Sequence, residues 1–401
     1  MSRPLEVLWV TAETPDRDRG GGGAIRQSHL IGQLARRATV DLLVSGEAPD
    51  AEVRGAVRHL TTIPRPERQI RFGEIGRRLV TAADATLPGG PSECRATGPA
   101  RRLVAEALSR RGRYDAILVE HLGLSPLLDL RRAGEAWLLT LHNLPSATAA
   151  QAFDVARSRR HLWVLRREFG ASRRREEAVL DGFDSVITVS EDDAAMLPGP
   201  TEVVPNGVDV DQFTPFPLAG SSTVLFTGSL NYLPNVDGLE WFCRDVWPRV
   251  RDRQDARLVI VGRAPVDRVC ALVDHNLGVS LHPDVESVVP YLRDARMAVV
   301  PLRHGSGTRL KALEALASAR PLVGTSTGLA GLGLVAGKDA LIHDDVDGLS
   351  AAIVAVLEDD DLAEGLSTRG PEVARRFSWG TVGEGLYDVV MSTVGRVAGG
   401  R

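Results

Sequence analysis

Residues 297–317 read MAVVPLRHGSGTRLKALEALA. The apolar run from Met297 to Pro301 is typical of a short buried strand, and the apolar residues from Leu310 onward are spaced as on one face of a helix. Gly305 and Gly307 separate the two, so the stretch predicts a strand, a glycine turn and a helix. The free backbone N–H groups at such a helix start carry partial positive charge, which suits a phosphate.

Two cations follow the glycine turn. Arg309 and Lys311 fall in the predicted first turn, where the helix dipole disfavours a cation by about 0.3–1 kcal/mol at an exposed site. A bound anion would reverse that cost. The chain has 46 arginines but only two lysines, Lys311 and Lys338, and lysine binds phosphate as a compact point charge. Glu314 lies one turn further on, within reach of a ligand's hydroxyls. The alternative is a tight turn whose two cations are solvated.

Length and composition restrict the class of protein. A chain of 401 residues is too long for one ordinary domain, and 43% hydrophobic with 25% charged residues is typical of a globular protein. The net charge of −4 gives no general attraction to nucleic acid or to an anionic membrane. The three cysteines are odd in number and far apart, which fits a reducing cytoplasm and neither a disulfide framework nor a metal site. No apolar run of 18 residues occurs, and 5–10 is too short for a signal peptide.

The first half begins as a strand–helix–strand unit. Residues 5–10 and 40–45 predict parallel strands, and 24–36 predicts the helix between them. The glycine run that contains Gly21, Gly22 and Gly23 lies where open α/β sheets bind ligands, at the carboxyl end of the first strand. A flexible surface loop fits the same glycines. Two further predicted strands end in His121 and His142, which are placed like site residues, although a lone histidine is often structural.

Two other segments of the first half carry many arginines. Residues 60–100 predict a loop-rich insertion with some helix. Residues 157–175 hold eight arginines and one acid, with apolar side chains interleaved. A basic amphipathic helix of this kind can lie on a membrane, but packing of its apolar stripe on its own domain is the favoured interpretation.

The second half repeats the alternation after a proline-rich linker at 215–220. Strands are predicted at 224–227, 258–262, 279–282, 297–301, 322–324 and 340–343. Helices are predicted at 235–250, up to 276, and at 286–293, 310–317, 348–357 and from 372 onward. Alternating strands and helices predict doubly wound parallel sheets. The sequence therefore predicts two Rossmann-like α/β domains, residues 1–212 and 213–379, that face each other across a cleft.

Four stretches of the second half together resemble the family-4 retaining glycosyltransferases, also called group 1, of GT-B architecture. They are VPNGVD (204–209), GSLNYLPN (228–235), VGRAP (261–265) and the loop and helix at 305–317. The first half is similar to the acceptor domain of that family through the glycine run, His142-Asn143 and residues 189–191. The resemblance covers nearly the whole chain. It also implies that the last helix, about 380–398, crosses back to the first domain.

The resemblance implies a donor site built from scattered residues. Glu314 matches the glutamate that holds the nucleotide ribose, and the preceding glutamate of the family motif is replaced by Ser306. Ser229 and Asn235 stand where many members have an arginine and a lysine on the donor diphosphate, so Arg309 and Lys311 are the natural replacements as catalytic residues. The other implied contacts are His142 with the donor sugar, Val285 near the base, Arg263 and the loop Gly305, Ser306, Gly307 and Thr308 with the donor, and Gly21, Gly22 and Gly23 as an acceptor or phosphate loop.

The function that the resemblance implies is transfer of a sugar, with retention, from a nucleotide sugar. UDP- or GDP-linked donors, a small-molecule or glycan acceptor, and a role in secondary-metabolite or exopolysaccharide biosynthesis are expected. Neither a metal nor another cofactor is expected, because Arg309, Lys311 and backbone N–H groups can stabilise the charge of the leaving diphosphate. A nucleotide-sugar epimerase and a binding protein with a decayed site remain as alternatives.

Overall fold

The computed structural model describes residues 3–17, 21–63, 91–144, 146, 150, 153, 159–199, 201–305 and 309–399. It divides into two compact units. Unit 1 comprises Met1–Pro205 and Val382–Arg401, and unit 2 comprises Asn206–Thr381. The division falls seven residues before the boundary expected after residue 212. Each unit is an α/β fold with one parallel sheet, as the sequence predicts.

Unit 1 contains a seven-stranded sheet in the order β3-β2-β1-β4-β5-β6-β7. The strands are β1 (Leu5–Thr11), β2 (Ala38–Ser45), β3 (His59–Ile63), β4 (Ala116–Glu120), β5 (Ala136–Thr140), β6 (Ser185–Thr188) and β7 (Thr201–Val203). All pairs are parallel. The chain builds outward from β1 in both directions, so the order reverses between β1 and β4. Open sheets bind ligands at the carboxyl ends of the strands beside such a switch point.

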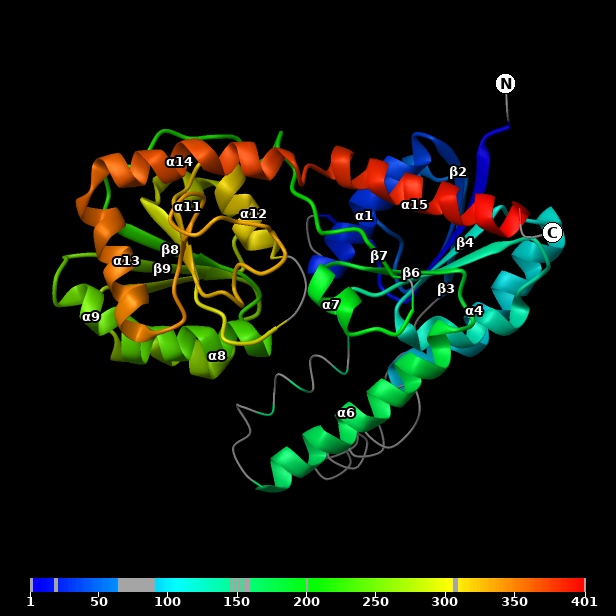
Figure 1. Cartoon of the computed structure of the whole chain (residues 1–401), viewed down its shortest axis with the longest axis horizontal. Helices are drawn as coiled ribbons and strands as arrows, with labels where there is room; N and C mark the ends of the chain where they lie inside the picture. Colours follow the sequence, from blue (N-terminus) through cyan, green and yellow to red (C-terminus); the bar gives the residue numbers. More distant parts are fainter. Residues whose placement is uncertain are drawn as a thin grey trace. The chain divides into compact units, whose positions relative to one another are not determined.

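Helices pack on both faces of this sheet. They are α1 (Gly22–Ala35), α2 (Ala51–Ala56), α4 (Pro91–Arg111), the 3₁₀ helix η1 (Leu122–Leu130), α6 (Arg159–Leu180), α7 (Glu191–Ala195) and most of α15 (Trp379–Gly399). Helix α15 lies against α1 (Figure 1), so closely that a Cβ atom on Gly383 would overlap Gln33. Arg37 strengthens this contact through an ion pair with Glu384 and a cation–π contact with Tyr387. The predicted return of the last helix thus has a packed partner within unit 1.

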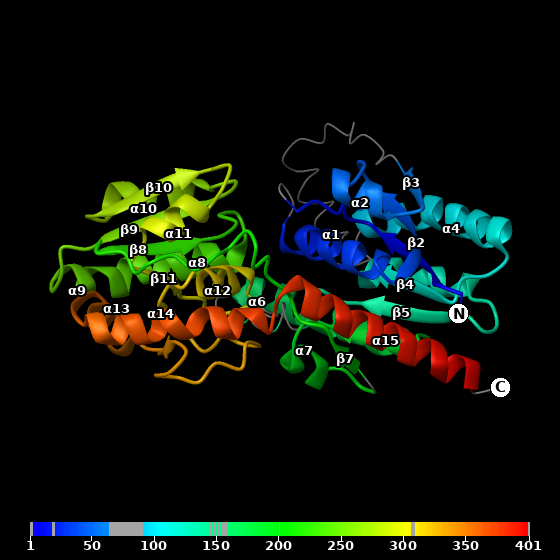
Figure 2. The same cartoon turned by 90° about the horizontal axis from the view of Figure 1, so that it is seen from above.

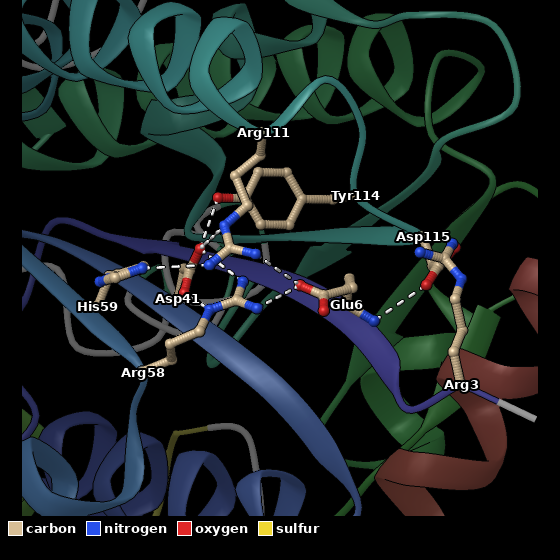
Figure 3. A network of polar contacts seen from close by, with 8 residues as sticks. All are labelled: Arg3, Glu6, Asp41, Arg58, His59, Arg111, Tyr114 and Asp115. Carbon is tan, nitrogen blue, oxygen red and sulfur yellow. Dashed lines mark hydrogen bonds and ion pairs between the residues drawn. The ribbon is translucent and has the colours of Figure 1, made fainter.

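Charged side chains join the first strands of unit 1 to α4 (Figure 3). Asp41 on β2 accepts two hydrogen bonds from Arg58 and one from the Tyr114 hydroxyl. Arg58 also pairs with Glu6 on β1, and Arg111 at the end of α4 lies 3.4 Å from Asp41. Burial alone would raise the pKa of Asp41, but the bonds from Arg58 and Tyr114 lower it below its ordinary value. This network is structural, because every charge in it has an opposite partner.

Unit 2 contains a six-stranded parallel sheet in the order β10-β9-β8-β11-β12-β13, and Figure 2 shows β10, β9, β8 and β11 side by side. The strands are β8 (Thr223–Thr227), β9 (Arg257–Gly262), β10 (Val279–Pro283), β11 (Met297–Val300), β12 (Leu322–Gly324) and β13 (Leu341–Ile342). Successive residues of β8 alternate between two apolar clusters: Val224 and Phe226 face one, and Leu225 faces the other. Both faces of the sheet are therefore buried, which explains the continuous apolar strand sequences. Its switch point lies between β8 and β11.

The helices of unit 2 are α8 (Leu233–Trp241), the π-helical turn η2 (Phe242–Val246), α9 (Trp247–Arg251), α10 (Asp267–His275), α11 (Val289–Asp294), α12 (Leu310–Ala317), α13 (Val346–Glu358) and α14 (Asp360–Arg375). Helix α14 begins twelve residues before the helix expected from Glu372. Gly365, Gly370 and Pro371 hide its pattern, since these residues weaken helices. Gly370 is required by packing, because a Cβ there would lie 2.7 Å from the Leu316 carbonyl oxygen of α12.

Among the helices within the described residues, none is long and apolar enough to cross a membrane. Helix α6, which carries much of the arginine-rich segment, places Trp163 in solvent with 60% of its surface exposed. Arg167 lies over the Trp163 ring at 5.5 Å from its centroid. Leu165 of the same helix is buried, so at least one apolar side chain of α6 packs on its own unit.

Candidate functional site

Lys311 reaches from the first turn of α12 to the end of strand β8. Its Nζ donates a hydrogen bond of 2.8 Å to Asn235 Oδ1 and lies 4.0 Å from the centroid of the Phe226 ring. A Cβ atom on Gly228 would lie 2.5 Å from this ammonium, so the glycine after β8 makes room for it. Burial and, to a smaller extent, the charge of Arg309 lower the pKa of Lys311 to about 7, against the opposing charge of Glu314. An amine of this kind is poised to gain a proton and become an ammonium beside an anion.

Arg309 forms the N-cap of α12 and lies just before its first turn. Its carbonyl accepts the amide hydrogens of Ala312 and Leu313, and only 8% of the residue is exposed. The guanidinium lies against Gly305, where a Cβ atom would be 2.8 Å from one of its nitrogens. Gly305 has a φ of +122°, which favours glycine. Ser306, Gly307 and Thr308, which were predicted to hold the donor, lie outside the described residues.

Glu314 and Arg263 complete the predicted charged group of unit 2. Burial raises the pKa of Glu314 to about 7, while the charges of Lys311 and Arg263 act in the opposite direction. Arg263 follows β9, and its carbonyl accepts the amide hydrogen of Leu230. Ser229 is exposed, and its carbonyl accepts a hydrogen bond of 2.8 Å from the Asn235 side chain. Arg263, Lys311 and Glu314 therefore interact electrostatically although 48 to 51 positions separate the first from the others.

Backbone contacts fix the loops that carry these residues. A Cβ atom on Gly262, the last residue of β9, would overlap the Gly228 carbonyl oxygen. Asp284, after β10, accepts the amide hydrogen of Ala264, and its own amide donates to the Gly262 carbonyl. Val285 is half-buried and packs against the apolar cluster of α11 and α12. The ends of β8, β9 and β10 are thus held together before any ligand arrives.

Asp237 on α8 anchors the segment that follows β11. Its carboxylate accepts two hydrogen bonds from Arg303, of 2.7 and 3.0 Å, and lies 3.4 Å from His304 Nε2. Burial would raise the pKa of Asp237, but the bonds from His304 and Arg303 outweigh it and lower the pKa to about 2. No pattern in the sequence indicates this role, because Asp237 and Arg303 lie 66 positions apart.

In unit 1, His142 lies at the carboxyl end of β5 and bonds to Glu120, the last residue of β4. The distance between His142 Nε2 and Glu120 Oε2 is 2.5 Å. Burial, with the charge of Arg26, lowers the pKa of His142 to about 3. Burial raises the pKa of Glu120 to about 7, while His121 and Arg26 oppose the rise. His142 is therefore neutral at pH 7, with Glu120 fixing the orientation of its ring.

The glycine loop meets this dyad at Gly23. A Cβ atom on Gly23 would lie 2.6 Å from Glu13 Oε2 and 2.8 Å from His142 Nδ1. Glu13 follows β1, and its carboxylate lies 3.4 Å from Gln27 Nε2 and 3.7 Å from His121 Nε2. The rings of His121 and His142 are 4.7 Å apart. The predicted residues His142 and Gly21–Gly23 are thus brought together at the switch point between β1 and β4.

Sequence reasoning missed three residues of this cluster: Glu13, Gln27 and Glu120. A glutamate that ends an apolar strand, as Glu120 does, was a usable signal, because such a carboxylate becomes buried. His121 has a φ of +73° and a ψ of 142°, a region that costs a non-glycine residue on the order of 1–3 kcal/mol and is frequent at functional sites. Gln27 gave no signal in the sequence.

Arg26 was also missed, and it connects α1 to the end of unit 1. It is fully buried, and its guanidinium donates to the carbonyls of Val204 and Pro205 at 2.7 and 2.5 Å. Burial lowers its pKa to about 10, and the charge of Glu120 opposes this. Arg26 thereby holds the start of the VPNGVD stretch against the helix that carries the glycine loop.

Comparisons with known proteins identify the family. The family model described as Glycosyltransferase Family 4 matches residues 20–212, and the one described as Glycosyl transferases group 1 matches residues 221–359. A phosphatidyl-myo-inositol mannosyltransferase of Mycolicibacterium smegmatis is 28% identical over 48% of this chain and 52% of its own length, so the match spans about half of that enzyme. A D-inositol 3-phosphate glycosyltransferase of Corynebacterium jeikeium is 25% identical over 94% of this chain and 92% of its own length.

Solved structures share the fold over nearly the whole chain. Sucrose-phosphate synthase from Thermosynechococcus elongatus has a TM-score of 0.70 with 19% identity and covers 97% of this chain and 98% of its own. HepE of Anabaena, in complex with UDP and glucose, has a TM-score of 0.59 with 14% identity and covers 97% and 100%. The two family models adjoin along the chain and together match most of it. The chain therefore belongs to the group 1, family-4 glycosyltransferases and has the GT-B fold.

Proposed function

We propose that the protein transfers a sugar from a nucleotide diphosphate sugar to an acceptor, with retention of anomeric configuration and without a metal ion. The position of Lys311 supports this most. Its side-chain nitrogen lies between Asn235 and Gly228 at the switch point of the sheet of unit 2. The charge of Arg309 helps to lower its pKa. Two cations at this edge of a sheet suit the two negative charges of a diphosphate.

The same residues account for the chemistry. Negative charge grows on the diphosphate as the bond to the sugar breaks, and donors already in place stabilise that charge best. In the proposed reaction the Lys311 ammonium and the Arg309 guanidinium do so, while the Glu314 carboxylate accepts hydrogen bonds from the ribose. Asn235 holds Lys311 and is itself fixed by its bond to the Ser229 carbonyl. The two cations supply the charge that a metal supplies elsewhere, so metal independence is part of the proposal.

The similarity to a solved structure supports the proposed class of substrate. HepE was solved with UDP and glucose, which supports a nucleoside diphosphate, and we include uridine and guanosine as candidate bases. The acceptor is a small molecule or a glycan, in secondary-metabolite or exopolysaccharide biosynthesis. The three dispersed cysteines support a cytoplasmic location.

The experiment is a screen of UDP-, GDP- and TDP-sugars with and without candidate acceptors. The quantity measured is the release of the nucleoside diphosphate. Lys311→Met should abolish release, whereas Lys338→Met, at the chain's only other lysine and exposed, should not change it. NMR of the product should show the anomeric configuration of the donor. Conversion of a donor without any acceptor would indicate an epimerase instead, and binding without conversion under every condition would indicate a non-catalytic protein.

Metal independence has its own test. Turnover should be unchanged after treatment with EDTA and dialysis, because the proposed charge stabilisation comes from protein groups. Activity that disappears with EDTA and returns with magnesium or manganese would overturn this part of the proposal and leave the sugar transfer intact.

A further inference from the structure

Helix α8 contacts both ends of the chain segment that carries the two cations of unit 2. Asn235, in its first turn, accepts the hydrogen bond from Lys311, which lies after the glycine turn. Asp237, two residues later, accepts two hydrogen bonds from Arg303, which lies before the turn. One helix therefore holds the chain on either side of the glycine turn.

The backbone at the end of β11 is fixed without Asp237. A Cβ atom on Gly238 of α8 would lie 2.6 Å from the Pro301 carbonyl oxygen, so the helix and the chain are in direct backbone contact there. On the other side, the Thr325 hydroxyl donates a hydrogen bond to the Leu302 carbonyl. The carboxylate of Asp237 is therefore not needed to hold the end of the strand. What it adds is the placement of the two residues that follow.

Those two residues, Arg303 and His304, both turn to the one carboxylate. Arg303 donates to both oxygens of Asp237 and lies over the Trp241 ring, 5.6 Å from its centroid. His304 is 7% exposed, and its Nε2 lies 3.4 Å from Asp237 Oδ2. A bidentate bond between a guanidinium and a carboxylate defines geometry as well as adding attraction. The backbone that leads into Gly305 is therefore fixed through Asp237.

Gly305 passes this placement on to Arg309. A Cβ atom on Gly305 would lie 2.8 Å from one terminal nitrogen of the Arg309 guanidinium and 3.3 Å from the other. The guanidinium thus rests on the backbone of Gly305, and only 8% of Arg309 is exposed. A side chain enclosed in this way follows the backbone beneath it, because close packing leaves it little room to readjust. A shift of residues 303–304 therefore moves the guanidinium.

We propose that Asp237 is a positioning residue for the donor diphosphate, because it fixes the chain on which the guanidinium of Arg309 rests. Asn235 does the same directly for Lys311, so that α8 sets the distance between the two cations. Cations that are in place before the ligand arrives bind and stabilise a diphosphate better than mobile ones. The inference rests on the proposed function, in which the two cations bind the diphosphate. No contact with substrate is assigned to Asp237 itself.

The test is a double-mutant cycle of diphosphate binding, measured by titration calorimetry with uridine or guanosine diphosphate, whichever binds the wild type. Asp237→Asn should weaken binding about tenfold, which is about 1.4 kcal/mol. In the Arg309→Ala background it should change the affinity by less than about twofold, because the guanidinium that it places is already gone. In the Lys311→Ala background it should keep its full effect. A general loss of folded protein would instead weaken binding in every background.

Asp245→Asn is the matched control. Asp245 accepts two hydrogen bonds from Arg244, which lower its pKa, and the charge of Arg303 acts in the same direction. The variant therefore removes the same charge from the same neighbourhood, and it should bind the diphosphate as the wild type does. Arg303→Gln, which breaks the pair with Asp237 from the other side, takes the place of Asp237→Asn in the cycle if that variant does not fold.

The possible results separate this inference from the proposed function. A wild type that binds neither diphosphate overturns the proposed function and this inference with it. Binding by the wild type that Asp237→Asn leaves unchanged overturns this inference alone. A loss of about tenfold that persists in the Arg309→Ala background shows that Asp237 does not act through Arg309, and it likewise overturns the inference.

Discussion

Binding of a nucleotide sugar should exchange protons with solvent, because two half-buried groups, Lys311 and Glu314, change charge when it binds. The pKa of Lys311 is lowered to about 7 and that of Glu314 is raised to about 7, both by burial. A diphosphate beside Lys311 favours the ammonium, and ribose hydroxyls beside Glu314 favour the carboxylate. We therefore expect both groups to be charged in the complex throughout the range from pH 6 to pH 8.

The direction of exchange should reverse near pH 7. At pH 8 about nine-tenths of Lys311 is neutral in the free protein, and Glu314 retains about one-tenth of a proton, so binding takes up about 0.8 proton. At pH 6 about nine-tenths of Glu314 is protonated in the free protein and only about one-tenth of Lys311 is neutral, so binding releases about 0.8 proton. Affinity should be highest near pH 7 and about threefold lower at pH 6 and at pH 8, which is about 0.7 kcal/mol.

Isothermal titration calorimetry in buffers of different ionisation enthalpy measures directly the number of protons taken up or released on binding. The ligand should be a nucleotide sugar, whose doubly esterified diphosphate does not titrate in this range. Lys311→Met should remove the uptake at pH 8, Glu314→Gln should remove the release at pH 6, and Lys338→Met should change neither. A proton number that is the same at pH 6 and pH 8, or an uptake that survives in Lys311→Met, would refute the reasoning.

The free protein should show the complementary effect on stability. Glu314 holds a proton in the folded state that it loses on unfolding between pH 4.5 and about 7, so its contribution to the free energy of unfolding falls as pH rises there. Lys311 gains a proton on unfolding between about pH 7 and 10.5, so its contribution rises with pH there. Urea denaturation of the wild type and the two variants at pH 6, 7 and 9 measures both slopes.

Five further substitutions test unit 2. Arg309→Ala and Lys311→Ala should each weaken nucleoside diphosphate binding by about 1.5–3 kcal/mol, the range for charge-assisted hydrogen bonds, and unchanged affinity in both by titration calorimetry would remove the basis of the donor site. Asn235→Ala should lower the free energy of unfolding by about 1–3 kcal/mol, because it leaves an ammonium and a carbonyl without their partner; a urea midpoint equal to that of the wild type would contradict this. Gly262→Ala should cost more than about 2 kcal/mol, because its Cβ overlaps a backbone carbonyl, whereas Gly365→Ala on α14, with nothing within 4 Å, should stabilise by about 0.5–1 kcal/mol. Equal melting temperatures for the two glycine variants would be the contrary result.

The sequence by itself determined the alternation of strands and helices and the charged group around Lys311. Parallel strands buried on both faces are continuous apolar runs, and those of β8 and β11 stand out because each ends at a glycine or proline. Helix α12 was predictable from its spacing, which is a local property of its eight residues. Lys311 stood out by composition alone, since it is one of two lysines. These signals need no knowledge of which strands are neighbours.

The tertiary structure decided which of these residues meet. Lys311 contacts Asn235, 76 positions earlier, because β11 lies beside β8 in the sheet. Glu120 and His142 meet because β4 lies beside β5, and Glu13 joins them because β1 lies beside β4. Periodicity reports the burial of a residue within its own element and says nothing of strand order. Strand order places the carboxyl ends of non-consecutive strands at one edge, and that placement turned scattered glutamates and histidines into a site.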